Sequence, residues 1–441
     1  MKISLIFPSR SRKSTYSSSN SKLQKLFDAN SYVPAFYLPS LSLLTIAACT
    51  PEDIEVKLID ERVAPIDFDE QVDLVGISIM TEQALRGYEI AREFKKRGVA
   101  TVMGGIHASV LPEEAAHHCD CVVIGEGEAL WPQLLEDFRK GSLKRFYTNK
   151  CRVDLLKSPT PRYELLDMSA YNLIPTQTTR GCPHDCSFCT ATKVYGAQFR
   201  SKTVKQVIDE VEAIQRVSQK HRIVFNDDNM FVDRKKAYQL LSALIPLKIK
   251  YFTESDASIA EDEKLLDLMQ KSGCVTVFIG FESLVAENLS SLQNNRWKFK
   301  RLATYSKVCQ KIQSYGIQVL GAFIAGFDHD DRSVFQKLID FTLENKILGQ
   351  YHCLTPYPGT RMRSSLINEK RLDQDHSQWN KYSCFDVVFD PLMMSKEDLE
   401  EGILQVYRTV YSSDAHAARS RHMIDIFKHL RHSGDLPHSR L

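Results

Sequence analysis

The sequence lacks an excess of charge of either sign. Its 57 lysines and arginines nearly balance its 55 aspartates and glutamates, which leaves a formal net charge of +2 over 441 residues. The basic side chains are scattered along the chain, so the electrostatic footprint of a nucleic-acid-binding protein is missing. We therefore expect a small-molecule substrate and no nucleic acid partner.

Long apolar runs are missing as well. The most apolar stretch, residues 32–49, is interrupted by Pro34 and Pro39, whereas a helix that spans a bilayer needs ~20 apolar residues. Near the start, apolar residues 3–7 precede basic residues in 10–13, which reverses the charge order of a secretory signal. These features predict a cytoplasmic protein without a transmembrane segment.

The cysteines do not indicate a disulfide framework. Their number, 11, is odd, and no secretory signal accompanies them, so clustered cysteines are better explained by metal or redox chemistry. Only Cys182, Cys186 and Cys189 stand at ligand spacing. The others are mostly flanked by apolar residues and are expected to be small buried side chains. They are Cys49, Cys119, Cys121, Cys151, Cys274, Cys309, Cys353 and Cys384.

Residues 1–145 alternate short apolar runs with helical patterns, which predicts a doubly wound parallel α/β sheet. The strands are predicted at 3–7, 54–59, 74–78, 99–103 and 121–124, with helices at 41–48, 83–97 and 130–138. In such sheets ligands bind beyond the carboxyl ends of the strands. Any one of the glycines there could simply serve a turn, but their joint placement favours a shared binding crevice. The G-x-G-x-x-G motif is absent after the first strand, which disfavours a dinucleotide as the ligand. The residues assigned to the crevice are Ser78, Thr81, Gly104, Gly105, His107, Gly125, Glu126 and Gly127.

After a linker at 146–171, residues 172–370 show six strand and helix units. This number predicts a partial (β/α)6 barrel that is open on one side, since a full barrel needs eight units. Strands are predicted at 174–179, 222–226, 251–254, 275–280, 317–325 and 352–355. Residues 371–441 are predicted to form a small helical region, with helices at 396–411 and 415–430.

The first barrel strand leads into a C-x3-C-x2-C motif made by Cys182, Cys186 and Cys189. Three thiolates on one loop can bind three irons of a 4Fe-4S cluster and leave the fourth iron open. An open iron can bind the amino and carboxylate groups of S-adenosylmethionine (SAM) and deliver an electron to its sulfonium. Zinc is the main competitor, but it needs a fourth ligand, and His184 lies within the same tight loop.

These motifs resemble the radical SAM superfamily, and within it the members that carry an N-terminal cobalamin-binding domain. The resemblance covers nearly the whole chain and implies a 5'-deoxyadenosyl radical produced at the cluster. Asn226-Asp227-Asp228 occupies the place of the motif that binds the SAM amino group, although it departs from the common Gly-Gly-Glu form. The resemblance assigns the adenine, ribose and carboxylate contacts of SAM to Phe188, Arg200, Glu282, Ser283, Gly321, Ile324, Gly326 and Thr355.

The crevice of residues 1–145 resembles a Rossmann-like cobalamin-binding domain fused to a radical SAM barrel. His107 has no aspartate two residues earlier, so the Asp-x-His-x-x-Gly run that supplies an axial histidine is absent. The resemblance implies methyl transfer from methylcobalamin to an unactivated carbon, with cobalamin bound without a histidine ligand. It further implies an external electron donor such as flavodoxin or ferredoxin.

The C-terminal region resembles that of hopanoid and bacteriochlorophyll methylases, in which it shapes the substrate pocket. This implies an apolar or tetrapyrrole-like substrate. No residue is assigned as a catalytic acid or base; Cys353 is the one candidate proton acceptor.

Three alternatives stay open at this stage. The first is a cobalamin-dependent cyclase, deoxygenase or rearrangement enzyme that transfers no methyl group. The second is an RNA methylthiotransferase, which would need a second cluster, for instance at Cys49, Cys119 and Cys121. The third is a non-catalytic sensor of cobalamin or SAM.

Overall fold

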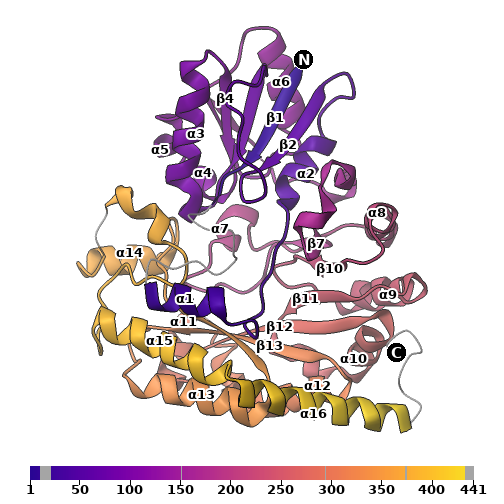
Figure 1. The fold of residues 1–441 in the computed structure, drawn as a ribbon, viewed down its shortest axis with the longest axis vertical. Helices are drawn as coiled ribbons and strands as arrows, with labels where there is room; N and C mark the ends of the chain where they lie inside the picture. Colours follow the sequence, from indigo (N-terminus) through magenta and orange to yellow (C-terminus); the bar gives the residue numbers. More distant parts are fainter. Residues whose placement is uncertain (10–20, 150, 294, 373–374, 433–441) are drawn as a thin grey trace.

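The structure is a computed structural model that describes residues 1–9, 21–149, 151–293, 295–372 and 375–432. Two six-stranded parallel sheets dominate it, one in each half of the chain (Figure 1). No helix among these residues is both long and apolar enough to cross a bilayer.

The first sheet has the order β2-β1-β3-β4-β5-β6, and every neighbouring pair is parallel. Helices cover both faces: Leu43 of α2 and Leu134 of α6 pack on one side, and Phe94 of α3 packs on the other. The predicted doubly wound sheet is confirmed, and β6 is an additional edge strand. The elements are β1 (Lys2–Phe7), α2 (Leu41–Ala48), β2 (Glu55–Asp60), β3 (Leu74–Ser78), α3 (Ala84–Lys96), β4 (Ala100–Gly104), α4 (Ile106–Val110), α5 (Pro112–Ala116), β5 (Cys121–Ile124), α6 (Trp131–Arg139) and β6 (Phe146–Thr148).

The second sheet has the order β14-β13-β12-β11-β10-β7, so its strands follow the chain and its two edges do not pair. This is the open, six-unit barrel that the sequence predicts. Its strands are β7 (Leu173–Thr176), β10 (Arg222–Phe225), β11 (Tyr251–Ser255), β12 (Cys274–Glu282), β13 (Gln318–Ala325) and β14 (Leu348–Cys353). The helices between them are α8 (Val204–Val217), α9 (Arg234–Leu244), α10 (Glu263–Ser272), α11 (Ala286–Leu292), α12 (Tyr305–Ser314) and α13 (Ser333–Asn345).

Local sequence explains where several of these helices begin and end. Thr203 and Gln206 form a capping box at the start of α8, which satisfies backbone donors that have no partner inside the helix. Helix α10 begins at the capping carboxylate of Asp262 and ends at Gly273, whose φ is 98°. A Cβ there would lie 1.9 Å from the carbonyl oxygen of Ile249, so only glycine fits.

Two barrel strands differ from the prediction. The first divides into β7 and a short β8 (Thr179–Arg180), which pairs antiparallel with β9 (Arg200–Ser201). The last begins at Leu348 and ends at Cys353, four and two residues earlier than predicted. The strand ends before Pro356 and Pro358, because proline has no N–H to donate to a neighbouring strand. Its start was not predicted because Gly349 and Gln350 have low β propensity.

The C-terminal region protects the edge of the barrel sheet. Tyr411 Oη accepts from Gly349 N at 3.2 Å and donates to Gly349 O at 2.8 Å, and Tyr407 bonds the backbone of Tyr351 in the same manner. These hydroxyls replace a neighbouring strand along β14. Tyr407 and Tyr411 are therefore buried structural residues. Helix α1 lies beside α15 (Figure 1), and the centroid of its Phe27 ring is 5.0 Å from that of Tyr407. The helices are α1 (Ser21–Ala29), α14 (Arg361–Asn368), α15 (Lys396–Val410) and α16 (Ser413–His432).

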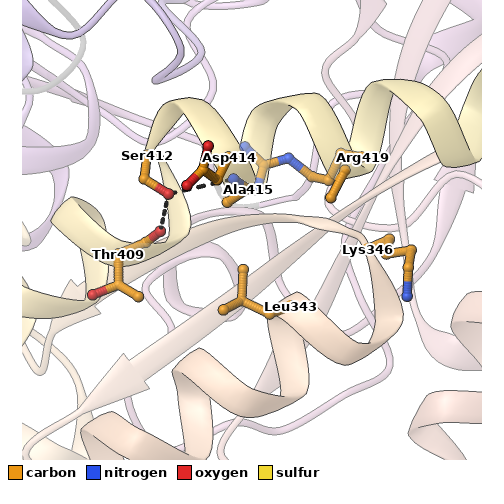
Figure 2. Close-up of a pocket in the computed structure, with 8 residues that line it drawn as sticks. Leu343, Lys346, Thr409, Ser412, Asp414, Ala415 and Arg419 are labelled. Atoms are coloured by element: carbon orange, nitrogen blue, oxygen red, sulfur yellow. Dashed lines mark hydrogen bonds between the residues drawn. The ribbon is translucent and has the colours of Figure 1, made fainter.

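A pocket of about 310 Å³ lies between α13, α15 and α16, and Leu343 and Arg419 are among its lining residues (Figure 2). Lys346, also in its lining, precedes the amino end of β14, whereas the cysteine loop follows the carboxyl end of β7. The pocket therefore lies toward the amino ends of the barrel strands, whereas the cysteine loop lies at their carboxyl ends.

Candidate active site between the two sheets

The cysteine motif forms a half-buried loop directly after β8. Burial raises the pKa of Cys182, Cys186 and Cys189 to about 11, and nearby acidic groups and the neighbouring cysteines add to the effect. Gly181, before the first cysteine, has φ of 88°, and a Cβ there would lie 2.3 Å from the Gln198 carbonyl oxygen. The loop thus presents three thiols that influence one another.

Several contacts that do not involve the thiols hold the loop in place. His184 Nε2 lies 3.0 Å from Asp256 Oδ2, and the imidazole packs against Trp297, with 4.7 Å between ring centroids. The backbone N–H of Ser187 donates to Leu292 O at 3.0 Å. His184 Nε2 is therefore engaged with Asp256.

The donor set fits an iron-sulfur cluster. Within the described ranges, no three His, Cys, Asp or Glu side chains are placed to hold a single metal ion. A 4Fe-4S cluster has a different requirement, because each thiolate binds its own iron. Three cysteines on one loop at the carboxyl end of a barrel strand meet that requirement.

The two aspartates that follow β10, Asp227 and Asp228, have different roles. Asp227 is buried and accepts from Thr178 N at 2.9 Å and from the backbone and hydroxyl of Thr179; burial raises its pKa to about 6. It holds the segment that leads to the cysteines. Asp228 instead accepts from Gly181 N at 3.2 Å, beside the thiols, and Asn226 is exposed.

Glu254, at the end of β11, was missed by the sequence reasoning. Burial raises its pKa to about 8, and Asp228 and Asp227 add to the shift. Among the described residues no side chain or backbone donor pairs with its carboxyl group. Its place at the carboxyl end of a barrel strand, in Thr253-Glu254-Ser255, was the signal that could have found it.

The end of β12 carries a strained residue. Glu282 adopts φ of 67°, a conformation that is costly for residues other than glycine, and its carboxylate lies 2.7 Å from Lys298 Nζ. Ser283 is buried and accepts from Val285 N at 3.0 Å, so it shapes the turn before α11.

Of the remaining residues predicted to contact SAM, Phe188 and Ile324 are half-buried, whereas Gly321, Gly326 and Thr355 are buried. A Cβ on Gly321 would meet the Phe323 and Phe281 rings at 2.9 and 3.0 Å, and one on Gly326 would meet Leu399 at 2.7 Å. Thr355 donates to Cys353 O at 3.1 Å. The two glycines and Thr355 thus serve packing and turns in this structure.

The crevice of the first sheet has an open rim. A Cβ on Gly104 would meet no atom closer than 3.9 Å, and one on Gly125 would meet none within 4 Å. Gly105 and Gly127 are instead packed closely against Ile79 and Ile46, and Thr81 is buried. Ser78, at the end of β3, lies 3.3 Å from Ser42 through their hydroxyls. The backbone of Gly104 and Gly125, at the ends of β4 and β5, is therefore not crowded on its Cβ side, which fits the approach of a large flat group.

His107 does not face this rim. It is fully buried, its Nε2 lies 3.0 Å from Tyr88 Oη, and its ring packs edge-on against Trp379. Its assignment to the crevice is corrected accordingly, because α4 turns this side chain toward α3 and the C-terminal region.

Two further predicted site residues, Glu126 and Arg200, pair with each other. Glu126 Oε1 lies 2.9 Å from Arg180 Nη1, and both carboxylate oxygens of Glu126 lie 3.0 Å from Arg200 Nη1. Arg180 also contacts Glu128 at 2.6 Å. Glu126 and Arg200 therefore join the crevice loop to the cysteine-bearing segment.

Comparison with known proteins decides the family. Residues 176–342 match the radical SAM superfamily, and residues 32–135 match the B12 binding domain. The bacteriochlorophyllide d C-12(1)-methyltransferase of Chlorobaculum tepidum is 32% identical over 386 residues, which cover 85% of this chain and 83% of that protein. The chain belongs to the cobalamin-dependent radical SAM methyltransferases. Its cofactors are accordingly SAM, a 4Fe-4S cluster and cobalamin.

Other relatives of this methyltransferase agree with the assignment. The hopanoid C-2 methylase of Rhodopseudomonas palustris is 29% identical over 78% of this chain and 67% of its own length. The radical SAM methyltransferase TsrM of Kitasatospora setae shares the fold, with a TM-score of 0.65 and 16% identity over 83% of this chain and 76% of that chain.

The other cysteines of the methyltransferase do not form a second cluster site in the described structure. Cys119 and Cys121 are fully buried, and Cys119 Sγ lies 3.3 Å from Ala115 O. Cys49 is half-buried, and burial raises its pKa to about 12. This arrangement argues against an RNA methylthiotransferase. Of the eight cysteines expected to be buried, five are; Cys151 is exposed, and Cys49 and Cys384 are half-buried.

The one candidate proton acceptor named from sequence is also inaccessible. Cys353 is 1% exposed, and burial raises the pKa of its thiol well above the ordinary value. The side chain of the preceding residue, His352, points to the opposite face of the strand. It is partly exposed, and partial burial lowers its pKa to about 4. The imidazole of His352 is therefore neutral near pH 7.

Proposed function

We propose that this enzyme methylates a carbon atom of a tetrapyrrole substrate. The observation that carries the proposal is the similarity to two bacteriochlorophyllide d methyltransferases of Chlorobaculum tepidum, at 32% and 30% identity over more than four fifths of both chains in each pair. The match to the hopanoid C-2 methylase covers less of both chains.

When bound, the cluster supplies the electron that cleaves SAM, and the cobalamin carries the methyl group. Cys182, Cys186 and Cys189 would hold three irons. Asp228 would accept a hydrogen bond from the SAM ammonium, since its carboxylate lies near Cys182. Glu254, whose carboxyl group interacts with Asp228, would accept a second one, and charged partners strengthen such bonds. Phe188 would pack on the adenine.

The crevice would hold the cobalamin at the ends of β4 and β5. Gly104 and Gly125 would leave the backbone accessible to its flat ring, and His107 is buried. His352 on β14 is the neighbour of Ile324, a predicted SAM contact on β13, and we assign His352 to the substrate wall.

Matched incubations test the substrate class. The enzyme is purified and reconstituted anaerobically, assayed for iron, sulfide and corrinoid, and then incubated with SAM and a reductant together with either bacteriochlorophyllide d or a hopanoid. The proposal expects a methylated product from the tetrapyrrole alone. Methylation of the hopanoid alone would contradict the tetrapyrrole assignment, and absence of corrinoid binding would contradict the methyltransferase mechanism.

A further inference from the structure

Gln293 makes a contact with the cysteine loop that the family assignment does not explain. It follows α11, is 3% exposed, and its Nε2 donates to Cys186 Sγ at a distance of 3.0 Å. The preceding residue, Leu292, accepts a backbone hydrogen bond from Ser187. The end of α11 is thus attached to the loop at two successive positions.

The orientation of the Gln293 amide is fixed by its second contact. Lys298 N donates to Gln293 Oε1 at 3.4 Å, so the NH2 group must face the sulfur. Lys298 is itself immobilised, because its Nζ contacts Glu282 Oε1 at 2.7 Å and donates to Gly280 O. The strained backbone at Glu282 and the buried Lys298 together hold the segment that carries Gln293.

The three thiols therefore have different surroundings. Backbone N–H groups interact with Cys182 and Cys189, from His184 in one case and from Ala191 and Thr192 in the other. Of these three thiols, only that of Cys186 receives a hydrogen bond from a side chain outside the loop within the described part of the chain. The cationic Lys298 also lowers the pKa of Cys186, against the larger effect of burial.

We propose that Gln293 is a positioning residue that raises the reduction potential of the cluster by donating a hydrogen bond to Cys186. The inference rests on the cluster assigned in the proposed function. Reduction adds one negative charge to the cluster, and a donor at a ligand sulfur stabilises the more negative state. Removing the donor makes the cluster harder to reduce, and therefore slows the reductive cleavage of SAM.

The experiment uses the reconstituted holoenzyme and compares Gln293→Leu with wild type. The matched control is Gln313→Leu, since Gln313 is also a buried glutamine but bonds Asn345 O on α13, away from the cysteine loop. Iron and sulfide content is measured first. The midpoint potential is then determined without SAM by redox titration monitored by electron paramagnetic resonance.

The proposal expects a lower potential in Gln293→Leu at unchanged iron content, a still lower one in Gln293→Glu, and the wild-type potential in Gln313→Leu. Equal potentials in wild type and Gln293→Leu would overturn it. If the variants fold poorly, wild-type enzyme labelled with 15N in glutamine side chains provides a second measurement: a hyperfine coupling from that nitrogen to the reduced cluster is expected, and its absence would overturn the inference. A wild-type protein that binds no cluster would instead refute the cluster assignment itself.

Discussion

Arg180 Nη1 lies 2.9 Å from Glu126 Oε1, across the boundary between the cobalamin crevice and the cysteine-bearing segment. Both side chains are almost completely buried, with 10% and 2% exposed. Arg180 immediately precedes Gly181 and the first cysteine, and Glu126 lies between the two glycines of the loop after β5. The ion pair therefore fixes the position of one cofactor site relative to the other.

Substitution of Glu126 by Gln is expected to destabilise the protein. The change leaves Arg180 and Arg200 without one carboxylate, and loss of one partner of a buried pair costs about 3–5 kcal/mol. Thermal and urea unfolding would measure the loss. The control is Glu136→Gln, which removes an exposed pair with Lys140 and should cost less than ~1 kcal/mol. Equal stability of the two variants would refute the role given to Glu126.

Glu254→Gln is expected to weaken SAM binding. A hydrogen bond to a charged group contributes about 1.5–3 kcal/mol, which corresponds to roughly a 10- to 100-fold higher Kd. Calorimetric titration of the reconstituted enzyme with SAM measures the change. Glu261→Gln serves as the control, because Glu261 is exposed and pairs with Arg301. An unchanged Kd for Glu254→Gln would remove this residue from the SAM site.

Gly104→Leu is expected to reduce corrinoid binding while the cluster is retained. The position has room for a Cβ, since the nearest atom would lie 3.9 Å away, so the fold should tolerate the change. The longer side chain would then occupy the space beyond β4. Corrinoid and iron are measured on the same preparation. Full corrinoid occupancy in the variant would show that cobalamin does not approach this rim.

Tyr411→Phe is expected to destabilise the protein by about 1–3 kcal/mol, because Gly349 N and O at the edge of β14 would lose their partner in a buried environment. Tyr37→Phe is a suitable control, since Tyr37 is 38% exposed. Urea unfolding followed by circular dichroism gives both values. A loss no larger than that of the control would mean that water replaces the hydroxyl.

The fold and the cysteine motif could be predicted from sequence because both are local patterns. Alternating apolar runs mark β1, β3 and β5 within a residue or two, and the spacing of Cys182, Cys186 and Cys189 is visible without any structure. Glu126 pairs with Arg180 and Arg200, which lie 54 and 74 residues away in the sequence. The local sequence around Glu126 and Arg200 does not reveal this pairing, and both were therefore predicted to contact cofactors. Gln293 was missed for the same reason, since its partner Cys186 lies 107 residues away.

The most direct measurement is mass spectrometry of an anaerobic reaction that contains SAM with a deuterated methyl group, a reductant and bacteriochlorophyllide d. The proposed function predicts that the deuterated methyl group appears on a carbon of the tetrapyrrole and that 5'-deoxyadenosine accumulates alongside it. Formation of 5'-deoxyadenosine together with a tetrapyrrole product that carries no label would contradict methyl transfer.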